Sequence, residues 1–237
     1  MVEELPKELV TPGERNFSFP VEGREDGQGY FCAAGRESKN AIVLIQEWWG
    51  LNVSICKTAE VFAEKGFAVL AVDIYRGKCA DSRETAGHLF TGLDFAGAVQ
   101  DIKAAAIALK AKGYAKIGIT GFCMGGALTV AAIASCDEFS AAAPFYGVPD
   151  LSKLDLSRVK VPVLAHFGEK DLMKGFSDKE AALNLESAMK GAGVTFTLHL
   201  WDAGHAFMNQ ANPANYHPEI ARQALEETTQ FFNKSFE

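Results

Sequence analysis

The stretch that decides the fold is Ile117-Gly118-Ile119-Thr120-Gly121-Phe122-Cys123-Met124-Gly125-Gly126-Ala127-Leu128. An apolar, partly β-branched run ends at a glycine, and a cysteine follows two residues later. Two further glycines and a run of small residues come after it. This pattern predicts a buried strand, a tight turn and a helix, with Cys123 at the turn.

The predicted turn favours a reactive thiol. Glycines on both sides of Cys123 permit the close strand-to-helix packing and the unusual φ values that a sharp turn requires. At a helix N-terminus, free N–H groups and the positive end of the dipole stabilise a thiolate or an oxyanion. Gly-x-Cys-x-Gly-Gly therefore fits a nucleophile elbow with sulfur in place of the usual serine oxygen. The alternatives are a packing turn and a dinucleotide loop, although Cys123 stands where that loop needs its middle glycine.

Composition limits the class of protein. With 237 residues, 48% of them hydrophobic, the chain can form one buried core, so we expect a single domain over 1–237 with an irregular lead-in at 1–16. A net charge of −7 and the lack of a basic cluster argue against nucleic acid and membrane surfaces as partners. The acidic, proline-broken N-terminus is unlike a signal peptide, which predicts a cytoplasmic protein.

The cysteine pattern argues against structural cross-links. Five cysteines are an odd number, and no Cys-x-x-Cys pair occurs among them. Neither a disulfide framework nor a metal site is therefore expected, and four of the cysteines read as ordinary small hydrophobic residues.

The fold class follows from the alternation of short apolar runs with helix-length segments after residue 41. That alternation predicts an α/β fold with a mostly parallel central sheet and helices on both faces. A turn-rich segment between 16–20 and 29–34 predicts an antiparallel hairpin at one edge. The predicted strands are 41–46, 68–73, 116–120, 141–146, 163–167 and 195–200, and the predicted helices are 53–65, 93–112, 125–135, 179–192 and 218–233. The polar segment 77–91 is a surface loop or a short helix over the site.

A thiol nucleophile needs a base and a third group that holds the base in one tautomer. Asp171 follows the predicted strand 163–167, and His205 follows the last predicted strand behind a glycine. The chain order of nucleophile, acid and histidine is the order found in α/β-hydrolases. The alternative acids are Asp202, Asp178 and Glu169. The remaining histidines lie in a polar segment, inside strands or before a proline: His88, His166, His199 and His217.

Two further roles concern the residues around the thiol. Backbone N–H groups of Met124 and Trp48 are the expected oxyanion donors, because such donors follow the nucleophile and an earlier strand. Glu47 ends a predicted buried strand, where a carboxylate would hydrogen-bond a thiol but repel a thiolate. It is either a proton switch or a plain capping or surface carboxylate.

Substrate-binding residues are expected at the same strand ends. Arg76 carries a planar fork that suits a substrate carboxylate, although a solvated surface arginine is an equal alternative. Aromatic residues at strand ends would line an apolar pocket that accepts a ring, unless they belong to the core: Trp48, Trp49, Phe122, Tyr146 and Phe207.

Taken together, five motifs resemble those of the dienelactone hydrolases (carboxymethylenebutenolidases), over residues 17–235. The motifs are Gln46-Glu47-Trp48-Trp49-Gly50-Leu51-Asn52, Gly121-Phe122-Cys123-Met124-Gly125-Gly126, Phe145-Tyr146-Gly147, Gly168-Glu169-Lys170-Asp171 and Ala203-Gly204-His205-Ala206-Phe207. The resemblance implies an α/β-hydrolase fold, a Cys123–His205–Asp171 triad, the Glu47 switch, and opening of an enol-lactone ring without a cofactor. Bacterial catabolic members of that family resemble one another in holding the substrate carboxylate with two arginines, and this chain departs from them at both positions. Arg76 stands one place nearer the tyrosine than the first of these arginines, and the position of the second falls near Asn209.

The sequence thus predicts a cysteine-dependent hydrolase of a lactone or small carboxylic ester, acting on a small molecule as a monomer or weak homodimer. A thioesterase or general esterase of the same fold is the nearest alternative. A non-catalytic receptor for small ligands and a redox-sensing cysteine protein are the alternatives from other classes.

Overall fold

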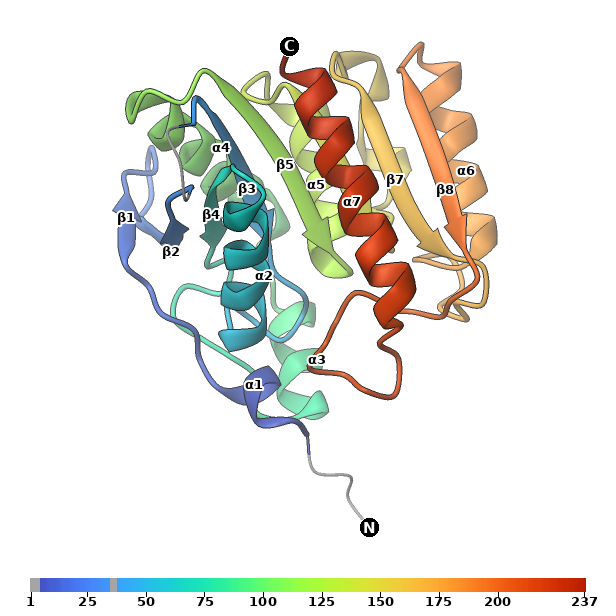
Figure 1. Ribbon diagram of the computed structural model, residues 1–237, viewed down its shortest axis with the longest axis horizontal. Coiled ribbons are helices and arrows are strands. Elements are labelled where there is room, and N and C mark those ends of the chain that lie inside the picture. Colours follow the sequence, from blue (N-terminus) through green and yellow to red (C-terminus); the bar gives the residue numbers. More distant parts are fainter. Residues whose placement is uncertain (1–4, 35–37) are drawn as a thin grey trace.

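A computed structural model describes residues 5–34 and 38–237 of the chain. Eight strands form one sheet in the order β1-β2-β4-β3-β5-β6-β7-β8 (Figure 1). The strands are β1 (Phe17–Phe19), β2 (Gly27–Cys32), β3 (Asn40–Ile45), β4 (Ala68–Val72), β5 (Lys116–Phe122), β6 (Ala141–Phe145), β7 (Val163–Gly168) and β8 (Phe196–Trp201). Each strand predicted from the sequence is present within two residues of its expected bounds.

The sheet is parallel from β4 to β8, because each of these strands pairs with its neighbour in the same direction. β1 and β2 pair antiparallel with each other, and β2 pairs antiparallel with β4. The hairpin therefore forms one edge of the sheet, as predicted. Parallel strands are covered on both faces, which explains why β3 reads as an unbroken apolar run whose residues 41–45 are fully buried.

Helices cover both faces, as an α/β-hydrolase fold requires. In Figure 1, α2 and α7 lie in front of the sheet, and α4, α5 and α6 lie behind it. The helices are α1 (Lys7–Val10), α2 (Val53–Glu64), α3 (Arg83–Thr91), α4 (Phe95–Ala111), α5 (Met124–Ser135), α6 (Lys179–Gly191) and α7 (Pro218–Ser235), with 3₁₀ turns η1 (Leu151–Lys153) and η2 (Leu156–Arg158). Four helices begin behind a side-chain cap, from Asn52, Ser82, Asp94 and Asp178.

The lead-in is more ordered than the sequence predicted. Residues 7–10 form the short helix α1, and Leu9 is fully buried. The Asn52 amide donates to the Leu9 carbonyl at 2.8 Å, and Asn52 also forms a β-bridge with Pro12. The prediction of an irregular segment is wrong here, because α2 supplies the partners that hold it. The start of the lead-in, 1–4, lies outside the described residues.

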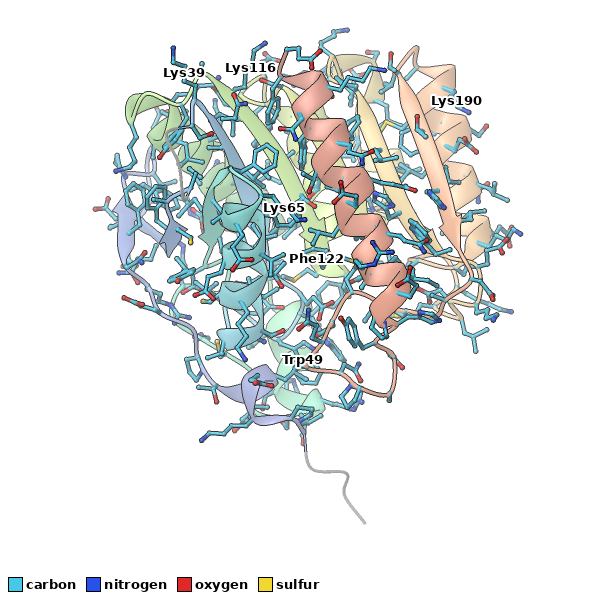
Figure 2. All side chains as sticks on the ribbon, viewed as in Figure 1. Lys39, Trp49, Lys65, Lys116, Phe122 and Lys190 are labelled. Atoms are coloured by element: carbon cyan, nitrogen blue, oxygen red, sulfur yellow. The ribbon has the colours of Figure 1, made fainter. Side chains whose placement is uncertain are left out.

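The two ends of the sheet differ in chemistry. Figure 2 places Lys39 and Lys116 at the end where β3 and β5 begin, and Trp49 and Phe122 at the opposite end. The reactive residue types of the sequence follow the carboxyl ends of the strands, so they gather at the aromatic end. Among the described residues, no helix is both long and apolar enough to cross a membrane.

Candidate active site

Cys123 stands at a sharp turn between β5 and α5. Its backbone has φ 55° and ψ −117°, and its N–H donates to the Phe145 carbonyl at 3.1 Å. The helix then passes close to the sheet: a Cβ on Gly125 would lie 2.5 Å from the Ile45 carbonyl oxygen. A side chain at this position would push α5 away from β3, so the glycines fix the turn that presents the thiol.

Backbone strain is concentrated around this turn. The described residues include four non-glycine residues with positive φ, and three of them flank the site: Cys123, Tyr146 and Ala206. Each such conformation costs roughly 1 to 3 kcal/mol and persists only where the surroundings enforce it. Strain at three strand ends that face one another identifies this end of the sheet as the candidate active site.

His205 and Asp171 form a close pair beside the turn. His205 Nδ1 lies 2.7 Å from Asp171 Oδ2, and the other carboxylate oxygen accepts from the Met173 N–H at 3.0 Å. The remaining acids that the sequence left open lie elsewhere: Asp202 pairs with a lysine, Asp178 caps α6 and Glu169 pairs with another lysine. Asp171 is therefore the one of these acids that contacts His205.

Ser177 is a second partner of the histidine that the sequence did not indicate. Its hydroxyl lies 3.1 Å from His205 Nδ1, and its side chain is fully buried. Serines in loops carry no pattern that distinguishes a histidine partner from a turn residue, so sequence alone had no signal for it.

The contact between His205 and Asp171 also affects the charge of the His205 imidazole ring. Burial lowers the pKa of His205, but hydrogen bonds with Asp171 and with the Cys123 thiol outweigh that effect and raise it to about 10. Burial of Asp171 acts to raise its pKa, and the hydrogen bond from His205 nevertheless holds it below its usual value. The two groups favour an imidazolium between a carboxylate and the sulfur.

Glu47 is buried, with 4% of its surface exposed, so the surface-carboxylate alternative is wrong. The Asn209 amide donates to one carboxylate oxygen, and the Tyr146 hydroxyl donates to the other at 3.3 Å. Burial raises the pKa of Glu47, and His205 and these two donors only partly oppose the effect. The protein thus favours a neutral Glu47 beside the thiol.

Replacement of Glu47 with glutamine is expected to remove a pH-dependent loss of stability. A carboxyl group whose pKa is higher in the folded than in the unfolded protein stabilises the fold fully below its unfolded pKa, which is about 4.5 for Glu47. It loses that contribution as the pH rises through its folded pKa. The free energy of unfolding of Glu47→Gln minus that of the wild type should therefore increase with pH above about 4.5. Urea denaturation at a series of pH values measures this difference, and a difference independent of pH would contradict it.

The site opens into a cleft of about 600 Å³. Both Glu47 and the Cys123–His205 pair reach its wall, which is otherwise mainly apolar. The other lining residues are Trp48, Trp49, Arg83, Phe90, Met124, Met173, Phe176, Ala206, Asn212 and Asn215. The segment 77–91, predicted as a loop or a short helix over the site, forms α3 and supplies two of them.

Three residues predicted to bind substrate lie outside this wall. Arg76 is bound by Asp101, with its Nη2 at 2.6 Å and its Nε at 3.1 Å from the two carboxylate oxygens, so its fork is already occupied. Phe207 is fully buried and packs against Tyr146, with ring centroids 5.2 Å apart. Tyr146 is also fully buried, and its hydroxyl serves Glu47. The prediction of direct substrate contact is corrected for all three.

The two residues predicted as oxyanion donors, Met124 and Trp48, both line the cleft. Met124 is the first residue of α5, where N–H groups have no partner within the helix. Trp48 lies in the turn closed by the hydrogen bond from the Gly50 N–H to the Glu47 carbonyl at 3.2 Å.

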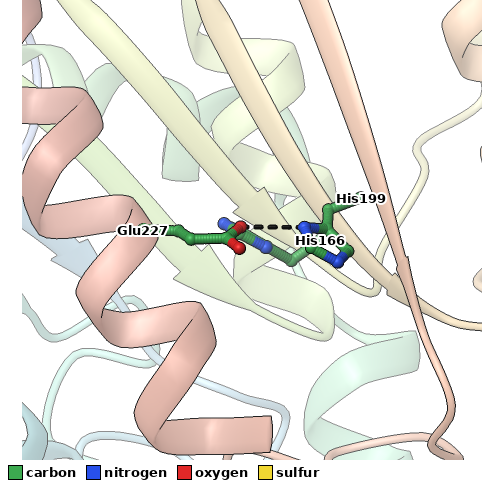
Figure 3. Close-up of side chains that lie close together, drawn as sticks. All are labelled: His166, His199 and Glu227. Atoms are coloured by element: carbon green, nitrogen blue, oxygen red, sulfur yellow. Dashed lines mark hydrogen bonds and ion pairs between the residues drawn. The ribbon is translucent and has the colours of Figure 1, made fainter.

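A second cluster of titratable groups lies away from the cleft. The side-chain atoms of His166, His199 and Glu227 that could bind a metal ion lie within 4.8 Å of one another (Figure 3). The Trp201 N–H donates to His166 Nδ1, so Nε2 carries the proton and donates to the Thr228 hydroxyl. Burial lowers the pKa of His166 to about 3 and keeps the ring neutral. Both of its nitrogens are engaged, so this histidine has no lone pair left for an ion.

Comparison with known proteins agrees with the fold and the motifs. The profile of the dienelactone hydrolase family matches residues 28–236. Protein usf of Aquifex pyrophilus is 32% identical over 205 residues, which are 81% of this chain and 87% of the relative. A carboxymethylenebutenolidase of Pseudomonas putida is 28% identical over 198 residues, which are 77% of this chain and 82% of the relative.

Solved structures share the architecture. The dienelactone hydrolase-like promiscuous phosphotriesterase P91 from metagenomic libraries aligns with a TM-score of 0.82 at 21% identity, over 93% of this chain and 97% of that chain. The Pyrococcus furiosus esterase Pf2001 aligns with a TM-score of 0.66 at 17% identity, over 96% and 94% of the two chains. These likenesses support the α/β-hydrolase fold, and the family profile goes further: the chain belongs to the dienelactone hydrolase family of carboxylic-ester hydrolases.

Proposed function

We propose that the chain hydrolyses a lactone or a small carboxylic ester through a Cys123–His205–Asp171 triad, and that the reaction it favours is the opening of an enol-lactone ring. The observation that supports this most directly is the 2.7 Å contact between His205 and Asp171 beside a cysteine held at φ 55°. A cysteine that served only in packing would need neither the strained turn nor an oriented base.

The reaction proceeds in two stages. The Cys123 thiolate attacks the carbonyl carbon, and the N–H groups of Met124 and Trp48 hold the oxyanion. Collapse of the tetrahedral intermediate breaks the ester bond, and His205 gives a proton to the leaving oxygen. Water then attacks the thioester with His205 as the base, which releases the carboxylic acid and restores the thiol.

Glu47 controls the charge of the sulfur in this proposal. An ionised Glu47 opposes a thiolate in the same cleft, whereas a neutral Glu47 tolerates it. Burial and the donors Asn209 and Tyr146 hold the carboxyl group in place. Where Glu47 is ionised, substrate binding that moves it away from the sulfur would let the pair of Cys123 and His205 act.

The test is turnover of enol lactones and small aryl esters by the purified protein. Saturable hydrolysis of at least one of these classes is the expected result. Stoichiometric binding of the same compounds without product would favour the alternative of a non-catalytic receptor and overturn the proposal.

We propose that Arg83 binds a carboxylate group of the substrate. It lines the cleft from the first turn of α3, whereas Arg76 is bound by Asp101. Replacing Arg83 with glutamine should lower kcat/KM for a carboxylate-bearing lactone by about threefold to tenfold relative to a neutral lactone, since exposed charge pairs contribute modestly.

The matched control for this prediction is Arg76→Gln, which removes a cation of the same type outside the cleft. It should leave the ratio between the two lactones unchanged. An unchanged ratio in Arg83→Gln, or a change confined to Arg76→Gln, would contradict the assignment.

A further inference from the structure

On the basis of the proposed function, we infer that the physiological substrate carries an extended apolar arm, either an alkyl chain or an aromatic ring. We propose that this arm lies along Phe176, Phe90 and Met173. The substrate class is thus a hydrophobic ester or substituted lactone, larger than the unsubstituted enol lactone of the family resemblance.

Aromatic rings lead outward from the catalytic pair. The ring centroids of His205 and Phe176 are 6.4 Å apart, and those of Phe176 and Phe90 are 6.5 Å apart in an edge-to-face arrangement. Phe176 is half-buried, and Phe90 is 42% exposed. An arm attached to a carbonyl near Cys123 would therefore meet a continuous apolar wall on its way to solvent.

Exposed apolar side chains are gathered at this end of the cleft. Of the large hydrophobic residues exposed in the described chain, Phe90 and Met173 line the cleft, and Leu172, 89% exposed, is next to Met173. Neighbouring apolar side chains that are exposed to water indicate a binding surface more often than apolar side chains scattered singly do. An apolar substrate arm would cover them.

Two tryptophans add to the aromatic lining of the cleft. The rings of Trp48 and Trp49 lie 5.2 Å apart in a T-shaped pair, and both residues line the cleft. The cleft therefore offers aromatic surface in addition to that of Phe176 and Phe90.

The volume of the cleft exceeds the needs of a small lactone. A cleft of about 600 Å³ lies in the size range of pockets that enclose drug-sized ligands. A five-membered lactone with one short carboxylate arm is smaller than such a ligand. The space that such a lactone leaves free lies beside apolar walls, which water fills less favourably than a hydrocarbon group does.

Arg83, a polar residue of the cleft, lies at a distance from Phe90 along α3. Arg83 begins α3 and Phe90 lies seven residues later, about 10 Å along the helix axis. A polar group of the substrate near Arg83 and an apolar arm near Phe90 would therefore occupy different ends of one helix.

The experiment measures kcat/KM for p-nitrophenyl acetate, butyrate, hexanoate and octanoate with the wild type, Phe90→Ala, Met173→Ala and Phe95→Ala. Phe95 is the matched control, because it is a 36% exposed phenylalanine that does not line the cleft. We expect kcat/KM to rise about threefold to fourfold per methylene before it levels off. The octanoate-to-acetate ratio should fall about fivefold or more in Phe90→Ala and Met173→Ala, and stay unchanged in Phe95→Ala.

Two results would overturn the inference: a wild type that prefers acetate, or an octanoate-to-acetate ratio that Phe90→Ala and Met173→Ala leave unchanged. Failure of the proposed function gives a different result, namely no hydrolysis of any ester, or hydrolysis that persists in Cys123→Ala.

Discussion

Replacing Cys123 with alanine is expected to lower kcat/KM for enol lactones and aryl esters by at least about 10³-fold, because the described residues that line the cleft include no other thiol and no hydroxyl group. The residual rate would come from the oxyanion donors and substrate binding alone. The side chain is small and 8% exposed, so the variant should fold. Steady-state kinetics with purified wild type and variant measure the effect.

Cys136 provides the control. It is also a buried cysteine, at the opposite end of α5, where its sulfur donates to the Ala132 carbonyl at 3.0 Å. Cys136→Ala should retain turnover within about threefold of the wild type, since its thiol touches no part of the cleft. Equal losses in Cys136→Ala and Cys123→Ala would point to a folding defect and remove the support for a nucleophile.

Replacing Asp171 with asparagine is expected to lower kcat by about 10³-fold to 10⁴-fold while leaving substrate binding largely intact. The amide keeps the shape of the carboxylate but can donate to His205 Nδ1, which then presents the wrong tautomer. Loss of the hydrogen-bonded charge also lowers the pKa of His205 from its raised value of about 10. The alkaline limb of the kcat profile should therefore move to lower pH.

Asp202→Asn is the matched control for Asp171→Asn. Asp202 is exposed, follows the same strand end as His205 and pairs with Lys170 rather than with the histidine. Its replacement should leave kcat and the pH profile unaltered. A loss in Asp202→Asn as large as that in Asp171→Asn would contradict the assignment of the acid.

The sequence predicted the fold well because the signals are local. Continuous apolar runs identified the parallel strands, and the glycines around Cys123 identified the turn. The hairpin edge was predicted from a turn-rich segment between two apolar runs, and β1 and β2 pair as expected. The short helix α1 was missed, since α2 and Asn52 rather than helix propensity hold it in place.

The partners of site residues were harder to predict, because they depend on contacts between distant segments. Arg76 looked available, but Asp101, a buried residue of α4, occupies its guanidinium. Arg83 lies in a polar stretch with no distinctive spacing, and only the folding of α3 over the cleft brings it to the site. Asn209 is 162 residues from Glu47 in the chain, and no local pattern links the two.

Aromatic residues at strand ends were equally ambiguous. Trp48 and Trp49 line the cleft, whereas Phe207 and Tyr146 are fully buried behind it. All four stand at or after the ends of predicted strands, so their position along the chain could not separate a wall residue from a core residue. Tyr146 itself and Ala206, the neighbour of Phe207, have positive φ, a local conformation that the strand pattern does not predict.

Trapping of the acyl-enzyme tests the central claim most directly. The wild type is mixed with an excess of an aryl ester, quenched in acid within the first turnover and analysed by intact and peptide mass spectrometry. The account predicts an added acyl group on the peptide that contains Cys123, and no adduct in Cys123→Ala. Turnover accompanied by an acyl group on another residue, or by an adduct that persists in Cys123→Ala, would contradict it.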